Sequence, residues 1–127
     1  MKRRISVVLG CLTLSVTLAA GAATASHWDH VPKKDHARTN PVAADPNAIA
    51  NGAAIYKDHC AQCHGANATG DGKKKPPLQS ESVRSATDGD LEWFLRQGDL
   101  AHGMPSWSSL PQAQRWQIVA YLRSLQQ

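Results

Sequence analysis

The residues best suited to chemistry lie in one short run, a Cys-x-x-Cys-His pattern at residues 60–64. This spacing is the attachment pattern for a c-type haem. Residues three apart on a helical turn point the same way, so Cys60 and Cys63 can both reach the vinyl groups on one edge of a porphyrin. His64 follows at once and can place its imidazole on the iron as the proximal ligand. The run therefore predicts one haem c, held by thioether bonds to Cys60 and Cys63 and by His64.

Three other kinds of site also use a Cys-x-x-Cys pair. A thioredoxin-like dithiol needs a preceding strand in a βαβ unit, and the sequence shows no such context. A zinc site needs a second pair of ligands, and the only other cysteine, Cys11, lies in an apolar N-terminal run. A disulfide across two residues gains little from closing so short a loop. None of these needs a histidine directly after the second cysteine, which favours haem attachment.

A second axial ligand is expected from Met104, which lies between Gly103 and Pro105, forty residues after His64. The flanking glycine and proline predict a stiff, non-helical loop that presents the side chain. A soft thioether favours ferrous iron and so raises the reduction potential. The other candidates are all histidines: His102 as the main rival, then His59 and the N-terminal group of His27, His30 and His36. A separate metal site built from those three N-terminal histidines is an alternative interpretation of the group.

The first 25 residues have the pattern of a secretory signal peptide. A basic start at residues 2–4 precedes an uncharged apolar run over 5–20, and Ala23-Thr24-Ala25 fits the cleavage pattern. Cys11 lies inside the apolar run rather than at its end, so it is expected to leave with the signal. We therefore expect a periplasmic or other extracytoplasmic protein. An uncleaved N-terminus that anchors the chain to a membrane is the alternative.

The charge of the chain changes once this signal is set aside. The 127 residues carry a formal net charge of +4, from 14 basic and 10 acidic side chains. Three of the basic residues and none of the acidic ones lie in residues 1–25, so the remainder carries only +1. A nearly neutral chain argues against nucleic-acid binding. No group of residues suggests a catalytic base or nucleophile, so the protein is not expected to be an enzyme by itself.

The elements that must position the haem ligands are helices. Apolar periodicity and capping residues predict them over 46–58, over 91–97, and from about 110 to the end of the chain. Asp45 followed by Pro46 is an N-cap and a helix-compatible first residue. In the last helix Ile118, Leu122 and Leu125 recur at helical spacing. No alternating run is present, so the fold class is expected to be all-α, with a polar, extended leader over 26–45.

The order of these features along the chain resembles the class I c-type cytochromes, and within them the bacterial subset attached to cbb3-type oxidases. The resemblance covers about residues 46–125 and depends on GAAIY at 52–56, CAQCHG at 60–65, PPL at 76–78, GMPSW at 103–107, and a final helix with Trp116 and Tyr121. It implies the cytochrome c fold, in which the N- and C-terminal helices cross with Gly52 against Tyr121. It also implies that a proline carbonyl, from Pro77 or alternatively Pro76, accepts a hydrogen bond from His64.

The function implied by the resemblance is single-electron transfer. The chain would divide into a signal peptide (1–25), the leader (26–45) and a monohaem cytochrome c domain (46–127). Its partners would be a redox donor and acceptor, such as a dehydrogenase, a terminal oxidase or another cytochrome. One alternative is a peroxidase-like haem enzyme or gas sensor with an open sixth coordination position and a merely structural Met104. Another is an electron-transfer subunit within a dehydrogenase or terminal oxidase.

Overall fold

The part of the chain that the computed structural model describes, residues 28–73 and 75–127, is helical. Its only β pairing is an isolated bridge between Asp99 and Met104, so the predicted all-α class is confirmed. The elements are α1 (Lys33–His36), α2 (Pro46–His59), α3 (Ala61–His64), α4 (Glu81–Ser85), α5 (Asp88–Gln97), the 3-10 turn η1 (Leu100–His102) and α6 (Gln112–Ser124).

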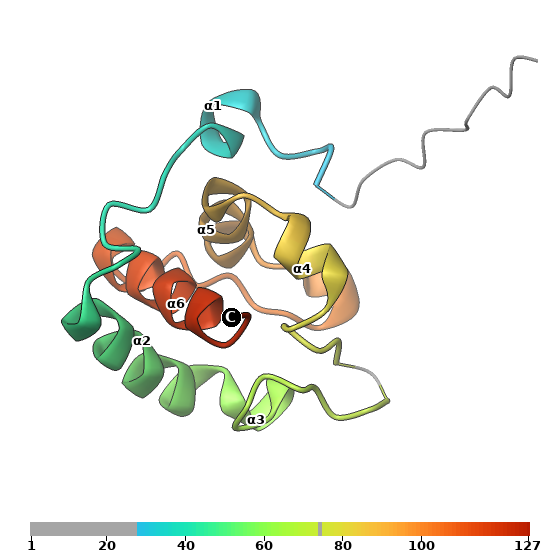
Figure 1. Ribbon diagram of the computed structural model, residues 1–127. Coiled ribbons are helices and arrows are strands. Elements are labelled where there is room, and N and C mark those ends of the chain that lie inside the picture. Colours follow the sequence, from blue (N-terminus) through green and yellow to red (C-terminus); the bar gives the residue numbers. More distant parts are fainter. Residues whose placement is uncertain (1–27, 74) are drawn as a thin grey trace, which may run out of the picture.

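Helices α2 and α6 pack against each other across the molecule (Figure 1). They approach closely because residue 52 is glycine: a Cβ atom there would lie 2.0 Å from the carbonyl oxygen of Gln117. The same Cβ position is 3.1 Å from the Cβ atom of Tyr121, and the rings of Tyr56 and Tyr121 meet at 5.3 Å between centroids. The predicted crossing of the N- and C-terminal helices is therefore present.

The ends of these helices follow their capping residues. The Asp45 carboxylate accepts the backbone N–H of Asn47 at the start of α2, as the sequence predicts. Helix α5 begins three residues earlier than the apolar pattern indicates, because Thr87 and Asp90 form a reciprocal capping box. It ends at Gly98, whose φ of +71° suits glycine. On α6, Ile118 and Leu122 are buried, while Leu125 is only partly covered.

Residues 28–45, here called the N-terminal strap, are not extended as the sequence suggested. They include α1 and lie against α5 and α6 (Figure 1). Trp28 is buried, donates its indole N–H to the carbonyl of Ser82 at 2.8 Å, and meets the ring of Phe94 edge-on at 5.7 Å. Asn40 donates to the carbonyl of Trp116 at 2.9 Å. The polar side chains of this segment, like Trp28, thus find their partners in helices that are distant in the sequence.

Buried charges fasten the strap to the helices beneath it. Glu92 has no exposed surface and accepts from Arg38 of the strap and from Arg115 of α6, both at 2.8 Å. Asp35 of α1 pairs with Arg96 of α5 at 2.8 Å. A buried carboxylate is tolerated only when hydrogen bonds and opposite charges compensate for lost hydration. Two arginines from different segments compensate Glu92, so the strap, α5 and α6 depend on one another.

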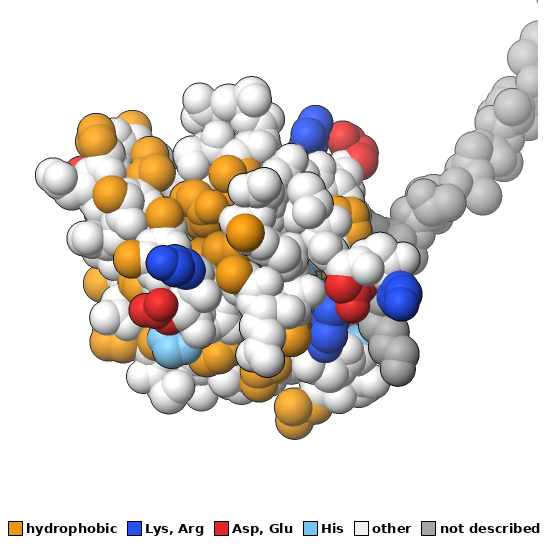
Figure 2. Space-filling view, turned by 90° about the horizontal axis from the view of Figure 1, so that it is seen from below, with side chains coloured by type: hydrophobic (Ala, Val, Ile, Leu, Met, Phe, Trp, Pro, Cys, Tyr) orange, Lys and Arg blue, Asp and Glu red, His pale blue; other side chains and the backbone are white. Residues whose placement is uncertain are grey.

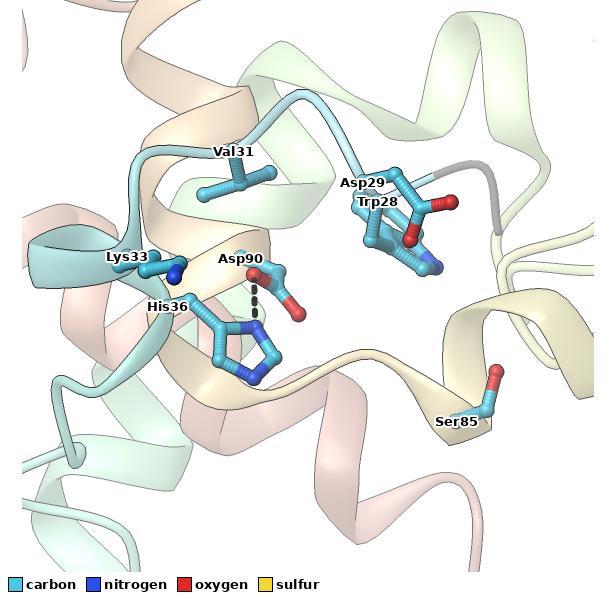
Figure 3. A pocket seen from close by; sticks show the side chains of 7 residues that line it. All are labelled: Trp28, Asp29, Val31, Lys33, His36, Ser85 and Asp90. Atoms are coloured by element: carbon cyan, nitrogen blue, oxygen red, sulfur yellow. Dashed lines mark hydrogen bonds and ion pairs between the residues drawn. The ribbon is translucent and has the colours of Figure 1, made fainter. Parts of the chain in front are cut away.

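A hollow of about 230 Å³ lies between the strap and the start of α5 (Figure 3). Its wall includes the pair formed by His36 Nδ1 and Asp90 Oδ1, 2.9 Å apart. Nearby, a Cβ atom on Gly89 would lie 1.9 Å from the carbonyl oxygen of Asp35. The backbone of α1 therefore rests directly on α5.

The signal peptide expected over residues 1–25, and with it Cys11, lies outside the described residues, as does His27. Among the helices that are described, none combines the length and the apolar character needed to cross a bilayer.

Candidate functional site

The Cys-x-x-Cys-His run forms the junction between α2 and α3. The N–H of Cys60 bonds to the carbonyl of Tyr56 at 2.8 Å, which closes α2. The N–H of His64 then bonds to the carbonyl of Cys60 at 2.9 Å, so the run makes one new helical turn. Cys60 is buried and Cys63 is exposed, and both thiols are free. A single turn thus carries both sulfurs and the imidazole, as the spacing predicted.

The electrostatics of Cys60 do not suit dithiol redox chemistry. Burial, reinforced by the neighbouring Cys63, raises the pKa of the Cys60 thiol to about 11. Thioredoxin-like sites instead lower the pKa of one cysteine so that a thiolate is present at neutral pH. Cys60 is therefore a buried, protonated thiol at neutral pH, which does not favour a thioredoxin-like dithiol site.

The imidazole of His64 is held in one orientation. The side chain is buried, and its Nδ1 atom lies 3.2 Å from the carbonyl oxygen of Pro76. A carbonyl can only accept, so Nδ1 carries the proton and Nε2 keeps its lone pair. Burial lowers the pKa of His64, although the Pro76 carbonyl acts in the opposite direction. The result is a neutral imidazole with Nε2 available, which is the form that binds a metal.

The carbonyl that accepts from His64 belongs to Pro76, not to Pro77, the proline placed first from the resemblance. The Pro77 carbonyl is instead directed to the backbone N–H of Ser80, at 3.3 Å. The next residue, Leu78, donates its N–H to Ala68 at 2.8 Å, and this fixes the register of the segment. Two adjacent prolines look alike in sequence, so only the path of the chain could separate them.

The loop after His64 folds back tightly to bring Pro76 into place. Gly70 donates its N–H to the carbonyl of His64 at 2.7 Å and has a φ of +76°. A Cβ atom on Gly70 would lie 2.6 Å from the Lys75 carbonyl oxygen, so the returning part of the loop passes directly beside Gly70. The loop therefore holds the His64 backbone through Gly70 and its imidazole through the carbonyl of Pro76.

Tyr56 supports the same turn, a role that was not predicted for it from the sequence. Its side chain is 1% exposed, and its hydroxyl donates to the carbonyl of Gly65 at 2.7 Å. Burial, with smaller effects of Cys60 and Tyr121, raises the pKa of Tyr56 to about 12, so the hydroxyl stays protonated at neutral pH. The sequence carried one signal for this role: Tyr56 is four residues before Cys60, on the same face of α2.

Met104 lies in a loop that is fixed to the end of α5. Backbone N–H groups of Asp99 and Met104 donate to each other's carbonyls at 2.8 and 2.9 Å. The N–H of Trp107 donates to Leu95 at 2.8 Å, and the Ser106 hydroxyl donates to the carbonyl of Arg96. Residues 98–107 are here called the Met104 loop. Its half-buried methionine is presented by backbone hydrogen bonds, as expected for a residue between glycine and proline.

The histidines proposed as rival ligands have other contacts. The side chain of His102 is 83% exposed, and its Nδ1 atom lies 2.7 Å from the Asp99 carboxylate. His30 meets Trp93, and His36 pairs with Asp90, both on the strap side. Within residues 28–73 and 75–127, no cluster of three or more histidine, cysteine or acidic side chains could hold a metal ion. The separate N-terminal metal site would include His27, which lies outside the described residues, so it stays an alternative interpretation.

The structure brings the two groups of predicted ligands to the same part of the molecule. Lys75, next to Pro76, donates its ammonium to the carbonyl of Gly103, next to Met104, at 3.3 Å. Figure 2 shows the face on the α2 and α3 side of Figure 1, where apolar side chains gather in the middle and charged ones are scattered around them. Two thiols on one turn, an imidazole nitrogen and a thioether are a donor set that fits haem c.

Comparison with known families gives one match. The family model described as cytochrome c oxidase, cbb3-type, subunit III matches residues 47–122. The matched segment contains the whole Cys-x-x-Cys-His turn and the Met104 loop, and it begins after the N-terminal strap. No curated protein matches the chain.

Proposed function

We propose, because the chain belongs to the family of cbb3-type cytochrome c oxidase subunit III, that this protein is an exported monohaem electron carrier with His64 and Met104 as axial ligands. A domain of this family is a c-type cytochrome domain, and its general chemistry is electron transfer through covalently bound haem c. The proposal adds two statements about this chain itself: which residues bind the haem, and that the protein serves as an electron carrier.

The observation that carries the proposal is the orientation of His64. Its Nδ1 proton is held by Pro76, so Nε2 is left as a metal ligand one residue after Cys63. Haem, when bound, supplies the one-electron redox chemistry. Cys60 and Cys63 would hold the porphyrin edge through thioether bonds, and Met104 would supply the second axial ligand. Backbone hydrogen bonds hold both ligand-bearing segments, so little of the chain would have to move when the charge changes.

Redox partners are proposed to approach the face that carries the attachment turn. Apolar side chains gather on this face (Figure 2). Near Met104, Leu100 of η1 is 79% exposed. An apolar contact area with dispersed charges suits a short-lived encounter between electron-transfer proteins. The partner classes are a donor such as a dehydrogenase or another cytochrome, and an acceptor such as a terminal oxidase complex.

The arrangement of the whole chain follows from the same proposal. Domains of this type are usually extracytoplasmic. Residues 1–25 would export the chain and be cleaved, and the haem domain would occupy 46–127 with the strap folded on it. Haem c would then be attached outside the cytoplasm.

The proposal is tested by spectroscopy of protein co-expressed with haem-attachment machinery. We expect a low-spin spectrum, thioether-shifted haem bands and the weak ferric sulfur-to-iron band of methionine ligation. Met104→Ala should abolish that band and lower the potential, whereas the matched change His102→Ala should leave both in place. High-spin iron that binds carbon monoxide readily at neutral pH would instead establish the haem enzyme or gas sensor with an open position.

A further inference from the structure

Two contacts join the Met104 loop to the side of the molecule that carries the haem-attachment turn. The ring of Trp107 meets the ring of His59 at 5.1 Å between centroids, with an angle of 55° between their planes. The ammonium of Lys75 donates to the carbonyl of Gly103 at 3.3 Å. The other hydrogen bonds of the loop run to α5, to residues 108–110 or within the loop itself, whereas these two contacts reach residues next to the attachment turn and next to Pro76.

The positions of the four residues are specific. His59 is the last residue of α2, directly before Cys60, and Lys75 directly precedes Pro76, the partner of His64. In the Met104 loop, Gly103 directly precedes Met104, and Trp107 is three residues beyond Met104. Each contact therefore joins a residue close in sequence to the His64 site to a residue close in sequence to Met104.

We propose that His59 and Lys75 are positioning residues that clasp the Met104 loop against the attachment side and so keep Met104 on the iron. The inference rests on the proposed His64 and Met104 ligation. The backbone N–H groups of Gly98 and Trp107 bond to carbonyls of α5, and Asp99 and Met104 bond to each other within the loop. These bonds hold the loop to α5, whereas the ring contact and the Lys75 hydrogen bond hold it to the attachment side.

The physical consequence is a population shift. An external ligand can reach the iron only in molecules whose Met104 loop has opened, so its apparent affinity is proportional to the fraction that is open. Removing either contact destabilises the closed form and leaves the open form unchanged. Apparent affinity for the external ligand should therefore rise with each contact that is lost.

The experiment is an imidazole titration of the ferric holoprotein at fixed pH and ionic strength. We expect His59→Ala and Lys75→Met each to raise imidazole affinity about threefold, and the double variant roughly tenfold, since a single contact of this kind is modest. The chain offers a matched control. His30 of the strap meets Trp93 of α5 at 5.2 Å between ring centroids, so His30→Ala removes a similar ring contact that does not involve the Met104 loop. Lys34→Met removes an exposed lysine charge from α1.

The outcomes separate this inference from the proposed function. An intact wild-type sulfur-to-iron band, with equal imidazole affinities for the clasp and control variants, overturns the clasp alone. A wild-type spectrum without that band overturns the ligation and the clasp together. If His59→Ala fails to accumulate, Trp107→Leu removes the same ring contact from the side of the Met104 loop. It should give the same threefold rise in imidazole affinity. Thermal unfolding of each variant separates a general loss of stability, which His30→Ala would share, from opening of the loop.

Discussion

The strap side and the haem side of this protein hold their polar groups in different ways. On the strap side Glu92 is fully buried, and both of its oxygens are matched by arginines of the same chain. On the haem side Cys63 is exposed, and the Nε2 atom of His64 is proposed to bind the haem. Glu92 and Asp35 find their partners within the polypeptide, although Arg96 Nε is buried without a hydrogen-bond partner among the described residues, whereas the proposed haem ligands would be completed by the cofactor. Under the proposed function, stability and electron transfer therefore depend on different sides of one small domain.

Removing Glu92 should have the largest effect. Glu92→Ala leaves Arg115 buried without its acidic partner and breaks the charged link from α6 to Arg38 of the strap. Loss of one partner of a buried pair costs about 3–5 kcal/mol. Denaturant unfolding of the holoprotein measures this cost, with Glu81→Ala on exposed α4 as the control. A loss for Glu92→Ala as small as that of the control would show that the strap side does not depend on this carboxylate.

Omitting the haem should affect the two sides unequally. In protein made without attachment machinery, the amides of α3 and of the loop to Leu78 should exchange with solvent on the order of a hundredfold faster than in the holoprotein. Such a factor corresponds to about 2.7 kcal/mol of local stability. The amides of Trp116–Leu122, packed between α2 and the strap, should change much less. Uniform acceleration in hydrogen-exchange mass spectrometry would remove the distinction between the two sides.

Tyr56 gives the haem side a dependence on high pH. Its pKa is raised from 10 to about 12 in the folded protein, so the folded form holds this proton more tightly than the unfolded form. The stabilisation is therefore fully present below about pH 10 and is lost as the pH rises to about 12, by roughly 2–3 kcal/mol. Tyr56→Phe should flatten that part of the stability profile, while Tyr121→Phe should not. Parallel profiles for Tyr56→Phe and wild type would contradict this assignment.

His36→Ala should have the smallest effect. Its imidazole is 56% exposed, and its partner Asp90 also accepts the N–H of Thr87 in the capping box. Because the imidazole is mostly in solvent and the buried Asp90 keeps the N–H of Thr87 as a partner, the loss should be about 1 kcal/mol or less, and the midpoint of unfolding should move only slightly. A loss of stability comparable to that of Glu92→Ala would show that the strap depends on the His36 pair as much as on Glu92.

Local signals in the sequence predicted the elements better than the contacts between them. Asp45 and Gly98 mark helix ends by chemistry that acts within a few residues, and the Cys-x-x-Cys-His spacing fixes its own turn. The partner of Glu92 could not be predicted in this way, because Arg38 is fifty-four residues distant and many other charges were available. The choice of Pro76 over Pro77 likewise depends on how the loop closes through Ala68. Backbone path and long-range charge pairing are properties of the folded chain.

The strap also decides where a working fragment of this protein can begin. Similarity to the family starts at residue 47, and a fragment cut there would keep Glu92 and Arg115 but lose Arg38, Asp35 and Trp28. Arg96 would lose its carboxylate partner, and the ring of Phe94 would lose its cover. Anyone grafting this haem domain onto another protein should therefore place the junction before Trp28, because the strap supplies Asp35 and Arg38, the partners of Arg96 and Glu92.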